Sequence, residues 1–261
     1  MRPGPGFGPT LVALEGASGS GKSEVARRLA ERNGWTIVSE AYERLRPRPS
    51  LAIPSAEALR RLERRLLHQD ALRFASATLA TAAVVVLDTG VIGPLTYVWA
   101  LGGDRGAKEV LPGLSREFGR LARGGAIGWP DLTFYLDAPA TVLHRRVDAA
   151  PATHPAQFAD RHARVGQVER KLWLERLGPR LGRAFVRVDA TRSPEHVTAD
   201  VERRVQRFRP TVASRSFDLL ALTTGWDEKP ASTRRPPRAG APAVRIPPSE
   251  RRPGASRRQP L

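Results

Sequence analysis

The sequence predicts an α/β domain in which a parallel sheet is covered by helices on both faces. Short apolar runs of strand length alternate with amphipathic stretches of helical length over residues 10–208. A glycine-rich loop lies between the first apolar run and the first helical stretch. The length of 261 residues suits one such domain with extensions at its ends.

The elements follow from local patterns. After Ser55, which is suited to cap a helix, leucines recur at helical spacing on one face and arginines occupy the other. A last helix is expected over 194–208 with Ser193 as its cap. The candidate strands are 10–14, 35–39, 83–87, 132–136 and 184–188.

The ends of the chain differ from this domain. Residues 1–9 are expected to be a flexible N-terminus, and 209–226 form an extension that the pattern does not assign. In 227–261, eight of 35 residues are proline and the net charge is +6, from nine basic and three acidic residues. Such a segment buries too little apolar surface to order itself, so we expect a disordered basic tail. The tail is either a weak anchor for an anionic partner or a solvated extension.

Composition excludes several classes of site. The chain has no cysteine, which rules out disulfides, thiolate metal sites and a cysteine nucleophile, and its five histidines are scattered. The longest uncharged, mostly apolar run, 75–87, is too short to cross a bilayer, and residues 1–9 do not read as a secretory signal. We therefore expect a cytoplasmic protein without a membrane partner. The net charge of +17, carried by 39 Arg and 4 Lys, favours anionic partners.

The glycine-rich loop matches the pattern GxxxxGK[ST] between a strand and a helix. Its glycines allow backbone N–H groups to converge on a phosphate, and the following helix adds its positive N-terminal end. Lys22 is suited to bridge β- and γ-phosphate oxygens of ATP, and the Ser23 hydroxyl is suited to Mg²⁺. The predicted nucleotide-binding residues are Gly16, Ala17, Ser18, Gly19, Ser20, Gly21, Lys22 and Ser23.

A second candidate group follows the third strand. Asp88 ends the run 83–87, and parallel sheets present ligand-binding groups at the carboxyl ends of their strands. Asp88 is therefore expected to hold Mg²⁺, together with Ser23, or to contact the acceptor of a phosphoryl group.

Several segments resemble thymidylate kinases. DTGVIGPLTY, beginning at Asp88, resembles their Asp-Arg-Tyr segment, and PDLTFYLD, ending at Asp137, resembles their next strand. The segment from Val188 to Glu195 resembles their last strand and helix, so the resemblance covers nearly all of 10–208. It implies a P-loop kinase fold with a five-stranded parallel sheet in the order 2-3-1-4-5, ATP as donor and Mg²⁺ as metal.

This sequence departs from that family at the acceptor site. Thr89 stands where thymidylate kinases carry the arginine that grips the acceptor phosphate, and Gly93 and Pro94 replace serines. A missing guanidinium removes a bidentate clamp worth about 2 kcal/mol, which weighs against a monophosphate acceptor.

Deoxynucleoside kinases, which share the fold, supply a second resemblance. In that family an acid after the second strand acts as base toward a sugar hydroxyl, and Glu40 occupies this place here. The resemblance thus implies that Glu40, or alternatively Asp88, takes the proton of an alcohol acceptor. A lid is implied over 145–164, with Arg146, Arg161 and Arg164 as candidate catalytic arginines.

The sequence therefore predicts an ATP- and Mg²⁺-dependent kinase of a nucleotide or nucleoside, in a chain that is compatible with a homodimer. Arg73 is expected on the helix that borders the acceptor pocket. The alternative is a P-loop ATP-binding regulatory protein or NTPase without a small acceptor, whose basic tail contacts nucleic acid.

Overall fold

The computed structural model describes residues 8–47, 49, 53–102, 104–149 and 156–209, with Arg105 and 156–163 described in the backbone only. These residues belong to one compact unit of the chain, Met1–Glu228. The expected tail, the extension apart from Arg209 and most of the expected N-terminus lie outside the described residues.

The sheet has five parallel strands in the order β2-β3-β1-β4-β5, which confirms the prediction. Each observed strand overlaps a predicted apolar run, with ends that differ by at most one residue. The strands are β1 (Thr10–Glu15), β2 (Thr36–Val38), β3 (Val84–Asp88), β4 (Leu132–Asp137) and β5 (Phe185–Asp189).

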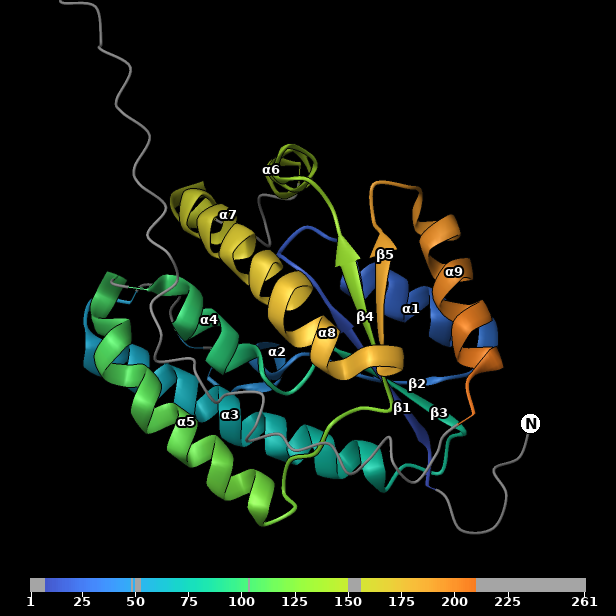
Figure 1. Cartoon of the computed structure of the whole chain (residues 1–261), viewed down its shortest axis with the longest axis horizontal. Helices are drawn as coiled ribbons and strands as arrows, with labels where there is room; N and C mark the ends of the chain where they lie inside the picture. The colour runs from blue at the N-terminus through green and yellow to red at the C-terminus, as the bar shows by residue number, and fades with distance from the viewer. Residues whose placement is uncertain (1–7, 48, 50–52, 103, 150–155, 210–261) are drawn as a thin grey trace, which may run out of the picture. The chain divides into compact units, whose positions relative to one another are not determined.

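Helices cover both faces of this sheet (Figure 1). Helices α1 and α9 lie on one face, and α3, α4, α5 and α7 lie on the other. The helices are α1 (Lys22–Asn33), α2 (Ala41–Arg44), α3 (Ala56–Thr78), α4 (Gly93–Leu101), α5 (Ala107–Arg123), α6 (Ala140–Asp148), α7 (Ala156–Lys171), α8 (Gly178–Leu181) and α9 (Pro194–Arg207).

Side-chain caps fix the start of two of these helices. Ser55 accepts a hydrogen bond from the Ala58 N–H at the start of α3, and Ser193 accepts one from the His196 N–H at the start of α9. Both caps were predicted from the sequence. They satisfy backbone donors that the first turn of a helix leaves unpaired.

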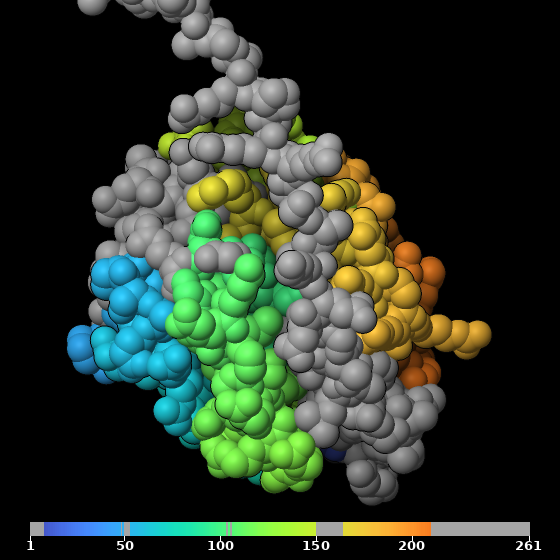
Figure 2. All heavy atoms as spheres, turned by 60° about the vertical axis from the view of Figure 1, so that its left-hand side comes forward, coloured from blue at the N-terminus to red at the C-terminus, as the bar shows by residue number. Residues whose placement is uncertain are grey.

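The two largest of the three apolar clusters among the described residues lie on opposite sides of the sheet. One packs β1, β3 and β4 against α1 and α9, with Leu14, Leu29 and Val201 fully buried. The other joins α3, α4, α5 and the end of the α7 run around Leu67, Phe118 and other buried side chains. In Figure 2, α3 and α5 lie side by side on this second face. None of the described helices is long and apolar enough to span a membrane.

Helix α7 continues without a break into a π-helical segment, Leu172–Leu177, and then into α8. A π-helical turn adds a residue to the repeat and rotates the side chains that follow. Glu169 of α7 and Trp173 of this π-helical segment both line a cavity beside the loop 16–21. The α7 run therefore forms one wall of the candidate site.

Candidate active site

The loop between β1 and α1 is built to receive an anion. Gly16 has a φ of +142°, and a Cβ there would lie 2.7 Å from the carbonyl oxygen of Leu136, so only glycine fits. Gly21 precedes α1 in the left-handed region, and no side chain caps this helix. The N–H groups of the first turn of α1 are therefore available to phosphate oxygens.

Lys22 lies at the base of this loop. Its Nζ donates hydrogen bonds to the carbonyl oxygens of Gly16 and Ala17, at 2.8 and 3.3 Å. The Oγ of Ser20 is buried without a hydrogen-bond partner among the described residues. An ammonium, an orphan hydroxyl and free helix N–H groups together fit the phosphates of a nucleotide.

Asp88 lies next to this loop because β1 and β3 are neighbours in the sheet. Leu14 pairs with Asp88 in the register of the two strands, and the Asp88 side chain is buried. One of its carboxylate oxygens, Oδ1, has no hydrogen-bond partner among the described residues. An orphan carboxylate oxygen at the carboxyl edge, with the exposed Ser23 hydroxyl at the start of α1, fits the oxygen ligands that Mg²⁺ takes.

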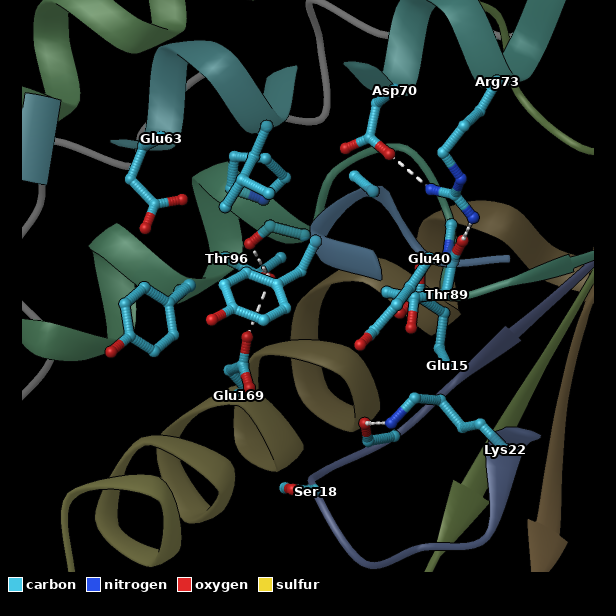
Figure 3. Close-up of a pocket in the computed structure, with 18 of the residues that line it drawn as sticks. Glu15, Ser18, Lys22, Glu40, Glu63, Asp70, Arg73, Thr89, Thr96 and Glu169 are labelled. Atoms are coloured by element: carbon cyan, nitrogen blue, oxygen red, sulfur yellow. Dashed lines mark hydrogen bonds and ion pairs between the residues drawn. The ribbon is translucent and has the colours of Figure 1, made fainter. Parts of the chain in front are cut away.

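A cavity of about 320 Å³ opens beside the loop (Figure 3). This volume lies within the range of small-molecule sites. Its walls come from the carboxyl end of β1, from α2, α3 and α4, and from α7. The charged residues that line it are Glu15, Lys22, Glu40, Glu63, Asp70, Arg73 and Glu169.

Glu40 and Lys22 line the same cavity, which brings the candidate base to the phosphate-binding loop. Burial raises the pKa of Glu40 above its ordinary value, and the negative charge of Asp88 raises it further. The Lys22 ammonium acts in the opposite direction and lowers it. Glu40 is thus a carboxyl group poised to exchange a proton nearer to neutral pH than an exposed glutamate does.

Glu15 and Glu169 are further carboxyl groups of the cavity. The Gly90 N–H donates to Oε1 of Glu15 at 3.0 Å, and a Cβ at position 90 would collide with this carboxylate. Thr96 donates to Oε1 of Glu169 at 2.8 Å. Burial is the largest cause of both pKa shifts and raises the pKa of Glu15 to about 8 and that of Glu169 to about 7.

Arg73 is almost fully buried and is engaged on several sides. It forms an ion pair with Asp70 one turn earlier on α3, and it donates to the carbonyl oxygens of Asp88 and Thr89 at 2.8 Å each. Burial raises the pKa of Asp70 to about 6 although the Arg73 guanidinium lowers it. Arg73 therefore lines the cavity, but its guanidinium is bound by groups of the protein.

Two of the three predicted lid arginines, Arg146 and Arg164, do not line the cavity. Arg146 lies beside Ser20 and Gly21 in a separate hollow on the outer side of the loop. Arg164 is exposed, and its guanidinium lies 3.9 Å from the Asp104 carboxylate. The side chain of Arg161 lies outside the described part of the chain, so its role stays a prediction.

Four carboxyl residues of the cavity were missed from the sequence, and each carries a recognisable signal. Glu63 and Asp70 occupy the buried face of α3, where Leu59 and Leu67 are their neighbours in the helical pattern. Acidic residues are almost never fully buried without a partner, so a carboxylate on an apolar face points to a site. Glu169 interrupts the apolar face of α7 in the same way, and Glu15 ends an apolar strand.

The comparisons with known proteins agree with this fold. A family model described as an AAA domain matches residues 11–229. No curated protein matches the chain in sequence. The structure is similar to deoxyadenosine kinase from M. mycoides with bound dATP, at 11% identity and a TM-score of 0.62, covering 75% of this chain and 99% of that chain.

Two further structures of the M. mycoides deoxyadenosine kinase are similar at lower scores. One has the products dCMP and a flexible dCDP bound, with 11% identity and a TM-score of 0.52, covering 76% of this chain and all of that chain. The other has dCTP bound, with 12% identity, a TM-score of 0.53 and the same coverage. At this identity the similarity shows the fold, which is the predicted P-loop kinase fold.

Proposed function

Since the chain belongs to the AAA domain family, we propose that it is a P-loop kinase that transfers the γ-phosphoryl group of ATP to a hydroxyl of a small acceptor. The observation that carries this proposal is the placement of Lys22 and Glu40 in one cavity. The loop around Lys22 is suited to the donor phosphates, and Glu40 is suited to the acceptor hydroxyl. A protein that only senses ATP has no need for this second feature. An ATP hydrolase uses such a carboxyl group to activate water, so the dependence of turnover on an acceptor separates the two functions.

A nucleoside suits the pocket better than a nucleoside monophosphate. Thr89 offers no guanidinium for an acceptor phosphate, and the Arg73 guanidinium is held by Asp70 and by two backbone carbonyl oxygens. The further carboxyl groups in the lining offer a phosphate dianion no positive charge, and those that are ionised repel it. The deoxyadenosine kinase whose fold this chain shares supports the same acceptor class.

In the proposed reaction, Glu40 accepts the proton of the acceptor hydroxyl while the oxygen forms a bond to the γ-phosphorus. The bond between the γ-phosphorus and the β,γ-bridging oxygen breaks, and that oxygen leaves on ADP. Lys22 and the N–H groups of the first turn of α1 stabilise the phosphate charge. Bound Mg²⁺, for which we propose Ser23 and Asp88 as the protein's ligands, would neutralise further phosphate charge.

Arginines of α6 and α7 complete the proposal. Arg146 already borders the loop at Ser20 and Gly21. We propose that Arg146, Arg161 and Arg164 add positive charge to the transferring group when the acceptor is bound, as lids do in kinases. Their contribution is separable, because each can be replaced by glutamine and tested singly.

The test is ADP formation by the purified chain with a panel of nucleosides and nucleoside monophosphates. We expect turnover that depends on an acceptor and is greatest with a nucleoside. Lys22→Ala abolishes this turnover and leaves the fold intact, because the hydrogen bonds of the ammonium among the described residues go to carbonyl oxygens of the loop. Lys108→Ala, an exposed position on α5, is the matched control and retains full activity.

Acceptor-independent ADP formation would instead support the NTPase alternative. Absence of turnover with every acceptor, or full activity of Lys22→Ala, would contradict the proposed kinase. The assay thus separates the two functions with the same protein and reagents.

A further inference from the structure

The cavity beside the loop is acidic although the whole chain is strongly basic. The net charge of the chain is +17, yet five carboxyl side chains and two cationic side chains line the cavity. These carboxyl groups come from four different elements of the chain: β1, the loop before α2, α3 and α7. Their convergence is produced by tertiary packing and is not a local run of acidic residues.

The two cations of the lining leave part of this acidic charge unmatched. Arg73 forms an ion pair with Asp70 and donates hydrogen bonds to backbone carbonyl oxygens. Lys22 lies at the loop and lowers the pKa of Glu15, Glu40 and Glu169. No cation among the described residues has a comparable effect on Glu63.

Glu63 is a buried carboxyl group that has no partner among the described residues. Its residue surface is 2% exposed, and none of the described residues donates a hydrogen bond to it or pairs with it. Figure 3 shows its side chain leaving α3 and extending into the cavity, on the side of Thr96 and Glu169. Burial and the charges of Asp70 and Glu169 raise the pKa of Glu63 well above its ordinary value. Burial of an isolated carboxyl group disfavours its charged form, so a ligand that brings a positive charge to this side chain would stabilise it as the carboxylate.

The position of Glu63 defines which end of a ligand it meets. Glu63 precedes Asp70 by seven residues on α3, which is about 10 Å along a helix. In Figure 3, Glu63 lies far from Lys22, whereas Glu40 lies between them. A molecule that spans the cavity therefore places one end at Glu40 and the loop and its other end at Glu63.

The lining around Glu63 favours an organic ligand over a metal ion. No group of three or more histidine or acidic side chains among the described residues could hold a metal. Aromatic side chains also line this cavity, namely Tyr42, Tyr97, Tyr135 and Trp173. Aromatic faces and a nearby carboxylate together attract a planar or alkylated organic cation.

We propose that the cavity selects a cationic acceptor, a molecule of nucleoside size whose positively charged group lies against Glu63 while its hydroxyl lies beside Glu40. The identity of the acceptor rests on the proposed kinase function, whereas the preference for a cation is a binding property that can be measured without ATP. The group transferred and the bonds broken are those of the proposed reaction.

The test compares pairs of isomeric nucleosides that differ in charge. 1-Methyladenosine is a cation at neutral pH and N6-methyladenosine is neutral; 3-methylcytidine and 5-methylcytidine form a second such pair. Isothermal titration calorimetry with the full chain, without ATP, measures the Kd of each. We expect the cation of at least one pair to bind about tenfold more tightly than its neutral isomer.

Two variants assign this preference to Glu63. In Glu63→Gln, which keeps the shape of the side chain, the cation and its neutral isomer bind within about twofold of each other. Glu57→Gln, an exposed position of the same helix, retains the preference. Circular dichroism confirms that both variants are folded.

Equal binding of the isomers overturns the proposal, since a protonated Glu63 would then serve as a hydrogen-bond group for a neutral base. An unchanged preference in Glu63→Gln, or no binding of either cation, overturns it as well. Turnover with neutral nucleosides and no cation preference leaves the kinase standing without this proposal. Cation preference that depends on Glu63, without ADP formation by any acceptor, supports the proposed binding and refutes the kinase.

Discussion

Arg73 on α3 holds the backbone of Thr89 at the carboxyl end of β3: one guanidinium nitrogen donates to the Thr89 carbonyl oxygen at 2.8 Å. The same nitrogen donates to the Asp88 carbonyl oxygen, and the ion pair with Asp70 holds the guanidinium in place. This buried arginine joins the cavity wall to the strand end that carries the proposed magnesium ligand. Its role is structural support of the site.

Replacing Arg73 by methionine removes this support. We expect Arg73→Met to lower the free energy of unfolding by about 3–5 kcal/mol, because Asp70 is left as an uncompensated buried charge. Chemical denaturation measures the effect, and Arg65→Met, an exposed position of the same helix, is the control. The double variant Asp70→Asn with Arg73→Met should cost less than the sum of the single changes. A loss below about 1 kcal/mol in Arg73→Met would contradict this role.

Thr89 adopts a backbone conformation that its side chain disfavours. Its φ is +67°, in the left-handed region, and its buried Oγ1 has no hydrogen-bond partner among the described residues. We expect Thr89→Gly to raise the free energy of unfolding by about 1 kcal/mol by relieving this strain. Thr89→Val is the control, because it removes the hydroxyl but keeps the β-branched side chain. An equal gain in both variants would assign the cost to the hydroxyl and not to the backbone.

Glu40 is the proposed base, so activity depends on its protonation state. Only the carboxylate form accepts a proton, and burial raises the pKa of Glu40 above the ordinary value of 4.5. The rate should therefore rise with pH through this raised pKa and level off above it. Glu40→Gln should lower kcat by about 10²- to 10⁴-fold and remove this rise from the pH profile.

The exposed neighbour Glu43 supplies the control for Glu40. Glu43→Gln should retain kcat, with a small shift of the profile to lower pH, because the Glu43 charge contributes to raising the pKa of Glu40. Full activity of Glu40→Gln would exclude this residue as the base and would leave Asp88 as the candidate base.

Glu63 lowers the stability of the protein when no ligand is bound. Its pKa in the folded state lies above the unfolded value of 4.5, so the folded state retains a proton that the unfolded state has released. Stability therefore falls as pH rises from about 4.5 toward the folded pKa. Glu63→Gln should raise the free energy of unfolding by about 1–3 kcal/mol at neutral pH, and less near pH 4.

Thermal unfolding at several pH values measures this effect of Glu63. Glu57→Gln should change stability by less than about 0.5 kcal/mol at every pH, because Glu57 is exposed. If Glu63→Gln destabilises the protein at neutral pH, the carboxyl group has a partner and the argument for a missing cation fails.

The basic segment 227–261 lies outside the described residues, and its contribution remains a prediction. We expect a chain ending at residue 226 to show the same kcat and KM as the full chain, because the described site is formed by residues before 190. Binding to an anionic polymer such as heparin, compared between the two chains, tests the electrostatic role of the tail. A large loss of turnover would show that the tail belongs to the reaction.

The sequence by itself determined the loop, its lysine, the strands, and the caps at Ser55 and Ser193. These features are local. A phosphate-binding turn, an apolar run and a helix start each depend on residues within a few positions of one another, so the spacing of residues in the sequence reveals them. The order of the sheet was also predictable, through the resemblance that the motifs carry.

Only the tertiary structure decided the composition of the cavity. Glu63 and Glu169 lie 106 positions apart in the chain, and they line one cavity because α3 and α7 pack on the same face of the sheet. In the sequence, each of them is visible as a single acidic residue on an apolar helical face. This pattern does not show which elements pack against that face. Packing likewise decides whether Arg73 binds a ligand or the protein's own carbonyl groups, because the burial and the hydrogen-bond partners of a side chain are properties of the folded chain.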